Sequence, residues 1–255
     1  MDYYLFLQLF GLSALVDSLG FIDFKYFHGV GYGLSMVAQT AALYTFFFWG
    51  TGTNLWVLLH GAALAVFGVR LSMFLWLRHS APSYQQVSIR RKKQAVNPNQ
   101  IPFMQKVVMW LMVSALFVCF TAPLQAVITQ NVRSYRIGVI LCWLGLTTEA
   151  LADQQKWISK QINPKQPCLV GLWKLSRHIN YFSELVFYTG NTIAGIPGLN
   201  SSYAYWAATL LGNAAIAFIL LKATAKLSAQ QKQMYATNPA WLQYANVTPK
   251  LIPFV

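Results

Sequence analysis

Long apolar segments are the feature of this sequence that most constrains its fold. A membrane-spanning helix needs about 20 predominantly apolar residues. A bilayer offers no partner for free backbone groups, and the runs are too long for barrel strands, so every span must be helical. The sequence therefore predicts an all-α, polytopic membrane protein of about seven transmembrane helices. Five apolar runs are clear and two are weaker: 30–50, 54–77, 106–128, 136–152 and 203–222, then 2–20 and 181–198.

The composition agrees with a membrane protein. Hydrophobic residues make up 56% of the chain and charged residues only 10%, against about 25% in a soluble domain. The mean hydropathy is +0.43. A chain of 255 residues has room for several helices and little else, so we expect a single integral membrane domain over residues 1–255.

The charge distribution predicts the orientation. The net charge is +13, but the basic residues are spread between apolar runs, which favours contact with anionic membrane lipids and excludes a nucleic-acid partner. With seven spans, every lysine and arginine except Arg70, Arg133 and Arg136 falls on one side, including the loop run Arg90–Lys93. The positive-inside rule makes that side, and the C-terminus, cytoplasmic. An endoplasmic-reticulum membrane and a bacterial inner membrane fit equally well.

Several common chemistries find no support in the residue pattern. The three cysteines, Cys119, Cys142 and Cys168, show neither a disulfide framework nor zinc spacing. The four histidines are scattered, so we predict no metal site and no nucleophile triad. The glycines of residues 29–33 lack the strand and spacing of a dinucleotide loop, and we interpret them as sites of close helix packing.

A first polar cluster lies at the end of the apolar run 136–152. Glu149, Asp153, Lys156 and Lys160 are spaced by 4, 3 and 4 residues, so on a continued helix they share one face. One interpretation is an ion-pair ladder that satisfies itself. The other is that the carboxylates accept hydrogen bonds from a ribose or an amide in a cytoplasmic cavity, while the lysines contact phosphate.

A second polar cluster follows at residues 176–184, Ser-Arg-His-Ile-Asn-Tyr-Phe-Ser-Glu. If the chain is helical from residue 177, Arg177, Asn180, Tyr181 and Glu184 line one stripe, with His178 at its edge. An arginine fork suits a phosphate, and the amide and carboxylate suit an amide or sugar. The alternative interpretation is a structural Arg177–Glu184 bridge.

Arg70 lies inside the apolar run 54–77. A mid-membrane arginine costs about 2.5–3.5 kcal/mol on insertion scales, so it should face a cavity or an acid such as Asp23 or Glu184. It is therefore either structurally paired or a substrate-binding residue.

The motifs together resemble the steroid 5-alpha-reductase superfamily. They are Glu149-x-x-x-Asp153-x-x-Lys156, then Gly171-Leu-Trp173-x-x-Ser-Arg-His-x-Asn-Tyr-Phe-x-Glu184, and near the end Tyr244 with Leu251-Ile-Pro253. The closest pattern is that of its widely distributed membrane branch, with Ser-Arg-His-Pro-Asn-Tyr-Phe-Gly-Glu. The motif-bearing part covers residues 136–255. Two positions depart from that pattern, because Ile179 replaces the proline and Ser183 replaces the glycine.

The resemblance implies a seven-helix oxidoreductase that uses NADPH to reduce a carbon–carbon double bond conjugated to a carbonyl, in a lipophilic substrate. The steroid enzymes' carbonyl-binding tyrosine and acid have no clear match in the N-terminal half, so the substrate is expected to be either steroid-like or another lipid. Glu149 stands where those enzymes have an asparagine. The cofactor-binding residues that the resemblance indicates are Glu149, Asp153, Lys156, Lys160, Trp173, Arg177, His178, Asn180, Tyr181 and Glu184.

Two other functions stay open at this point. Membrane methyltransferases that act on prenylcysteine or phospholipid headgroups with S-adenosylmethionine also carry an Arg-His-x-x-Tyr motif followed by an acid. Asn180 and the acidic face upstream favour the reductase. The third alternative is a non-catalytic relic that keeps the motif for its fold.

Overall fold

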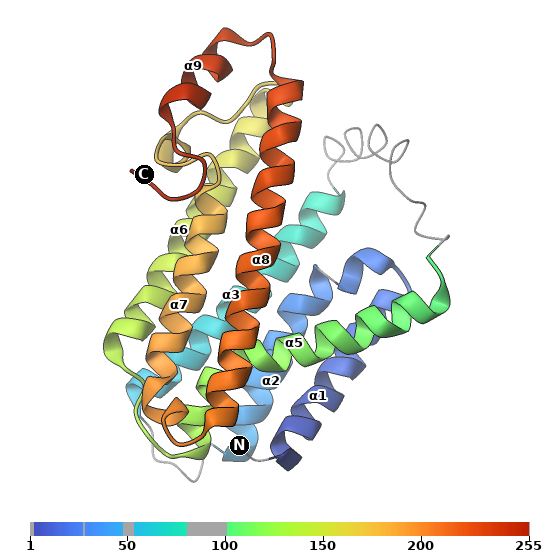
Figure 1. Cartoon of the computed structure of the whole chain (residues 1–255), viewed down its shortest axis with the longest axis vertical. Helices are drawn as coiled ribbons and strands as arrows, with labels where there is room; N and C mark the ends of the chain where they lie inside the picture. Colours follow the sequence, from blue (N-terminus) through green and yellow to red (C-terminus); the bar gives the residue numbers. More distant parts are fainter. Residues whose placement is uncertain (1–2, 28, 48–53, 81–100, 255) are drawn as a thin grey trace. The chain divides into compact units, whose positions relative to one another are not determined.

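The computed structural model describes residues 3–27, 29–47, 54–80 and 101–254 (Figure 1). Throughout these residues every regular element is a helix and there is no strand, which confirms the predicted all-α class. The basic run Arg90–Lys93 lies outside the described residues.

Seven long helices coincide with the seven apolar segments. They are α1 (Tyr3–Asp17), α2 (Val30–Phe47), α3 (Leu55–Ser80), α5 (Phe103–Thr129), α6 (Arg136–Ile162), α7 (Ile179–Leu199) and α8 (Tyr203–Met234). The shorter elements are η1 (Ser18–Phe21), η2 (Phe24–Phe27), η5 (Gly171–Lys174) and α9 (Pro239–Val247).

Within the described residues, four helical stretches are long and apolar enough to cross a membrane. They are Tyr4–Phe21, Leu55–Arg78, Phe103–Thr129 and Tyr203–Met234. These stretches indicate membrane insertion. α6 falls outside this group because its second half carries the charged cluster at 149–160. Seven spans and a cytoplasmic C-terminus therefore stay predictions.

The helices divide between two compact units. Unit 1 comprises residues 1–139 and 191–213, and unit 2 comprises residues 140–190 and 214–255. Neither unit is one continuous stretch of chain, and the expectation of a single integral domain stays a prediction.

Glycine lets α2 and α3 approach closely in unit 1. A Cβ atom built on Gly33 would lie 2.2 Å from the carbonyl oxygen of Gly68, and one built on Gly68 would lie 2.4 Å from that of Gly33. A Cβ on Gly31 would lie 2.6 Å from the Tyr26 carbonyl oxygen. These contacts confirm the predicted close packing at Gly31 and Gly33.

Buried polar side chains join α1, α2 and α5 in unit 1. The carboxylate of Asp17 accepts hydrogen bonds from the hydroxyls of Ser35 and Ser114, each at 3.0 Å. One helical turn away, Gln39 donates to Ser13 and accepts from Thr121. Since an unpaired polar group in an apolar bundle costs several kcal/mol, these matched partners define the register of the three helices.

His60 makes a second buried polar contact in unit 1. Its Nε2 lies 2.8 Å from Oδ1 of Asn191, whose amide nitrogen donates to the carbonyl of Phe120 at 2.8 Å. The amide oxygen must therefore accept from His60, so a neutral His60 carries its proton on Nε2. Its Nδ1 can then accept from the hydroxyl of Ser134 at 3.0 Å.

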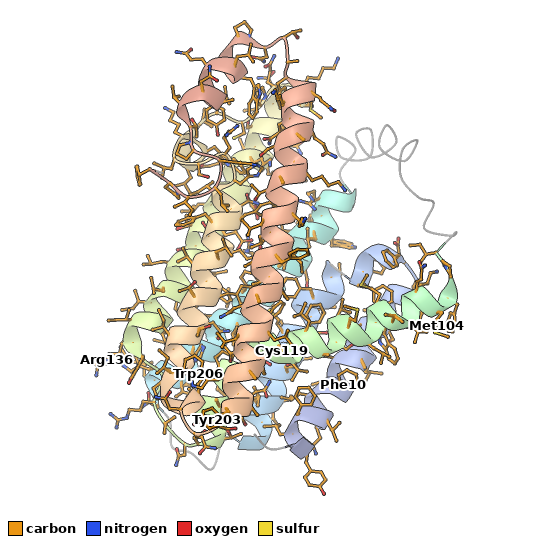
Figure 2. The ribbon with its side chains drawn as sticks, viewed as in Figure 1. Phe10, Met104, Cys119, Arg136, Tyr203 and Trp206 are labelled. Carbon is orange, nitrogen blue, oxygen red and sulfur yellow. The ribbon has the colours of Figure 1, made fainter. Side chains whose placement is uncertain are left out.

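Apolar side chains also cover much of the outer surface of unit 1. Met104 and Tyr203, labelled at the first turns of α5 and α8 in Figure 2, are 68% and 95% exposed. Exposed apolar side chains along helices that are long enough to span a bilayer are typical of a lipid-facing surface.

In unit 2, α6 and α7 pack side by side in opposite directions (Figure 1). A Cβ atom on Gly145 would lie 2.6 Å from the carbonyl oxygen of Ser183 and 2.7 Å from the backbone nitrogen of Phe187. Further along, Asn180 contacts Asp153. This antiparallel pairing brings the two polar clusters of the sequence together.

The glycine contact of unit 1 yields a stability prediction. Gly68→Ala should lower the thermal midpoint in detergent by several degrees, because overpacking costs about 1–3 kcal/mol and the opposing atom is backbone that cannot turn away. The matched control is Gly11→Ala in α1, where a Cβ would meet nothing within 4 Å. That control should keep or raise the midpoint, since alanine is the better helix former. Equal midpoints for the two variants would contradict the packing account.

Candidate functional site

The first polar cluster is helical throughout, as predicted. Glu149 and Asp153 lie one turn apart on α6 and are only 4% and 7% exposed. Lys156 is half-buried, and its Nζ lies 4.5 Å from the centre of the Trp173 ring. Both carboxylates are thus placed in the interior of unit 2, where hydrogen-bond donors rather than water must satisfy them.

Lys160 is engaged in holding a loop. Its ammonium donates to the carbonyls of Pro164 and Gln166 and, at 2.9 Å, to the hydroxyl of Tyr235. These contacts use all three N–H donors of a lysine. Lys160 therefore closes the end of α6 onto the segment after α8.

The second cluster begins in a turn rather than in a helix. α7 starts at Ile179, so the expectation of helix from residue 177 is wrong. The N–H of Tyr181 bonds to the carbonyl of His178 rather than to that of Arg177, while the backbone N–H of Arg177 donates to the carbonyl of Pro249 at 2.9 Å. The carbonyl of His178 then accepts the first bonds of α7, from Tyr181 and Phe182. Only the residues from Asn180 onward share a helical stripe.

The two clusters meet across α6 and α7. Asn180 directs its amide nitrogen at Oδ1 of Asp153, at a long 3.5 Å, and Glu184 follows one turn later on α7 with 8% exposure. Tyr181 is half-buried beside Asn180. Glu149, Asp153 and Glu184 are three of the six acidic residues of the chain, and all three are buried in unit 2.

His178 is buried and neutral at physiological pH. Its Nε2 lies 2.9 Å from the hydroxyl of Ser228, and its ring stacks on Tyr181 with centres 5.7 Å apart. Burial, together with the positive charges of Lys156, Arg177 and Lys250, lowers the pKa of His178 to about 4. His178 therefore contributes packing and one hydrogen bond, not a charge.

The C-terminal tail is a part of the site to which the sequence motifs assigned no role. The hydroxyl of Ser176 donates to the carbonyl of Leu251 at 2.7 Å. The hydroxyl of Tyr244 donates to the carbonyl of Trp173 at 2.6 Å, and burial raises the pKa of this phenol. The sequence did signal the tail, because Tyr244 and Leu251 belong to the motif pattern. Spacing along the chain could not show what they contact.

Trp173 and the loop before it have structural partners. The Trp173 side chain is buried, and its indole N–H donates to the carbonyl of Ala152 at 2.9 Å. Gly171 has a φ of 59°, a conformation that favours glycine. The next backbone N–H, of Leu172, donates to the side-chain oxygen of Gln155 at 2.8 Å. The loop is thereby tied to α6.

The two departures from the motif that the sequence resembles are accommodated locally. Ile179 is buried against Ala152 and Trp173. As the first residue of α7, it stands where proline is also tolerated. The hydroxyl of Ser183 donates back to the carbonyl of Ile179 at 2.8 Å, so the added polar group is satisfied within its own helix.

Arg70 belongs to α3 in unit 1, whereas the other candidate residues belong to unit 2. Its guanidinium carbon lies 5.9 Å from the centre of the Phe67 ring, one turn earlier on the same helix. This cation–π contact partly shields the charge inside an apolar helix.

The lowered pKa of His178 gives a pH prediction. The imidazole of His178 is protonated below about pH 6.5 in the unfolded state but only below about pH 4 in the folded state. The free energy of unfolding therefore falls as the pH is lowered from 6.5 to 4. The loss from this residue amounts to about 3 kcal/mol at most. His178→Gln should flatten the dependence of the unfolding midpoint on pH between 6.5 and 4. An unchanged slope in the variant would contradict the buried, neutral histidine.

Comparison with known proteins places the chain in a family. The profile of the family described as "Protein of unknown function (DUF1295)" matches residues 9–248, nearly the whole chain. No curated protein and no solved structure gave a match. The profile covers both polar clusters and Tyr244, and it ends just before the tail residues Pro249 and Leu251. The chain therefore belongs to DUF1295, a family in the steroid 5-alpha-reductase-like group.

Proposed function

We propose that this protein is a membrane-embedded reductase that uses NADPH to reduce a carbon–carbon double bond conjugated to a carbonyl in a lipophilic substrate. The observation that carries the proposal is the meeting of the two polar clusters in unit 2. Buried carboxylates on α6 and α7 lie beside an amide and a turn that bears Arg177. Membership of the steroid 5-alpha-reductase-like group supports the same reading.

The residues present fit the chemistry of a dinucleotide. Carboxylates accept hydrogen bonds from ribose hydroxyls and from a carboxamide, which assigns Glu149, Asp153 and Glu184 to those groups. Nε of Arg177 is buried and has no hydrogen-bond partner among the residues that the structure describes. A guanidinium fork with an unused donor suits a phosphate.

The remaining candidate residues divide by their contacts. Asn180 and Tyr181 would hold the cofactor together with the carboxylates, because both are half-buried on the first turn of α7. Lys160 and Trp173 instead hold the fold around the site, since their donors already have partners. His178 packs beneath Tyr181.

When bound, NADPH supplies a hydride for the electron-poor carbon of the substrate's double bond. The buried carboxylates of α6 and α7 and the amide of Asn180 would orient the cofactor. Reduction also needs a hydrogen-bond donor for the substrate's carbonyl oxygen as that oxygen gains negative charge. That donor is not assigned, and Arg70 stays a candidate substrate-binding residue with structural pairing as the alternative, because an arginine inside an apolar helix must either be paired or serve a site.

The membrane arrangement that accompanies this function has seven spans. α2, α6 and α7 would join the four more apolar stretches, and the C-terminal tail would lie on the cytoplasmic side, where NADPH is available. Such a protein would reside in the endoplasmic-reticulum membrane or the bacterial inner membrane.

Ligand-dependent stability tests this function directly. For the purified protein in detergent, NADPH should raise the unfolding temperature, because a ligand at 100 times its Kd adds about 2.7 kcal/mol of stability. Glu184→Gln and Arg177→Ala should each reduce that increase. Gln154→Ala, an exposed neighbour of Asp153 on α6, is the matched control and should leave it unchanged.

Other outcomes of the same measurement would overturn the proposal. Stabilisation by S-adenosylmethionine alone would identify a methyltransferase instead. No stabilisation by NADPH, NADH or S-adenosylmethionine would favour a non-catalytic protein that retains the motif for its fold. An increase by NADPH that both variants retain in full would discredit the site drawn on α6 and α7.

A further inference from the structure

We infer that the C-terminal tail, residues 249–254, lies in the headgroup layer of the membrane and binds a surface of anionic lipid. The apolar anchors of this lipid-binding surface are Leu175, from the turn before α7, and Ile252 and Phe254 of the tail. Lysines on the same two segments supply positive charge. The inference concerns unit 2 alone and goes beyond the proposed function, because it does not depend on which cofactor or substrate the protein takes.

Hydrogen bonds hold the tail against the turn before α7. The hydroxyl of Ser176 donates to the carbonyl of Leu251 at 2.7 Å, and the backbone N–H of Arg177 makes a second bond to the tail at 2.9 Å. The anchor Leu175 directly precedes Ser176, and the anchor Ile252 directly follows Leu251. The backbones of these two anchors are therefore fixed beside each other at one level of the bundle.

All three anchors are open to the surroundings of unit 2. Phe254 is 87% exposed, Ile252 is 51% exposed and Leu175 is 37% exposed. Single exposed apolar side chains are ordinary, but three of them on two hydrogen-bonded segments form a patch. Exposed apolar patches mark sites of contact with proteins or membranes. The exposure of the anchors thus calls for a partner that covers apolar groups.

The position of the turn along α8 places the tail near the membrane surface. Exposed apolar side chains on α8 continue to Phe218 and Leu221, at 62% and 55%, and Lys222 is its first charged residue. The edge of the hydrocarbon core therefore lies near Lys222. Ser228, which contacts His178 of the turn at 2.9 Å, is about six residues or roughly 9 Å further along. The headgroup layer is about 5–8 Å thick, so side chains of the tail can reach it. Figure 1 shows the chain turning back after α9 toward the start of α7.

The charge of unit 2 favours an anionic lipid surface as that partner. All three acidic residues of the unit, Glu149, Asp153 and Glu184, are buried. Lys174 and Lys250 belong to the two segments that carry the anchors. A surface with cations and no carboxylate side chain repels a second copy of itself and attracts anionic headgroups. Among the described residues of unit 2, the exposed charged side chains are Lys165, Lys174, Lys222, Lys226, Lys232 and Lys250.

The first measurement is the depth of a nitroxide spin label on the tail. The full-length Phe254→Cys variant is labelled and placed, one molecule per disc, in nanodiscs of phosphatidylcholine and phosphatidylglycerol; the three native cysteines are buried. This label should collide more with oxygen, which concentrates in lipid, than with a water-soluble nickel chelate. Thr237→Cys, in the exposed turn after α8, is the matched control and should show the opposite preference.

The second measurement tests the lysines. Lys174→Ala and Lys250→Ala should each lower the ratio of lipid-immersed to water-exposed label at position 254 by roughly fivefold, the contribution of one lysine near an anionic surface. Nanodiscs of phosphatidylcholine alone should lower the ratio as well. Lys165→Ala is the matched control and should leave it unchanged, because Lys160 ties that exposed lysine's loop to Tyr235, beyond the far end of α8.

Three results would overturn the inference. If the label at position 254 met the nickel chelate as readily as the label at position 237, the tail would lie in water. Shielding of position 254 from both oxygen and the chelate would show that protein rather than lipid covers the patch. Equal immersion with and without phosphatidylglycerol would remove the preference for anionic lipid. None of these readouts involves a cofactor, so each stands apart from the test of the proposed function.

Discussion

The cost of burying polar and charged groups is the constraint on which the rest of this structure depends. The chain is 56% hydrophobic and carries six acidic residues, yet four of those acids are buried: Asp17 in unit 1 and Glu149, Asp153 and Glu184 in unit 2. Such groups persist in an apolar interior only with donors around them. In unit 1 the serines opposite Asp17 supply those donors and set helix register. In unit 2 the three carboxylates lie on the neighbouring helices α6 and α7. Fixing the register of two helices does not need three buried carboxylates.

The site on α6 and α7 owes its shape to segments outside both helices. The tail meets the turn before α7 through the backbone of Arg177 and the hydroxyl of Ser176, and Tyr244 contacts Trp173. Lys160 closes the other end of the loop onto Tyr235. Because their hydrogen-bond donors are already used, Lys160 and Trp173 hold the fold around the site rather than bind a cofactor.

Ile179 and Ser183, the two departures from the motif that the sequence resembles, are both accommodated by the structure. Ile179 starts α7 at a position whose backbone N–H needs no helical partner, and its side chain adds to the core around Trp173. The hydroxyl of Ser183 returns to its own helix, and the close approach to α6 occurs at its backbone, opposite Gly145. Neither substitution places an unsatisfied polar group in the interior, so neither supports the view of the protein as a relic.

The sequence by itself determined the all-α class, the seven helical segments and the sharing of one helical face by Glu149, Asp153 and Lys156, because hydrophobic length and a period of 3.6 residues are local properties. It also indicated that the glycines of residues 29–33 serve packing. Only the tertiary structure decided that Arg177 and Ser176 bond to the C-terminal tail and that Lys160 holds the loop after α6 to Tyr235. Each depends on a hydrogen bond to a residue distant in the chain, such as Pro249, Tyr235 or Leu251, and no local pattern encodes which distant carbonyl or hydroxyl will accept it.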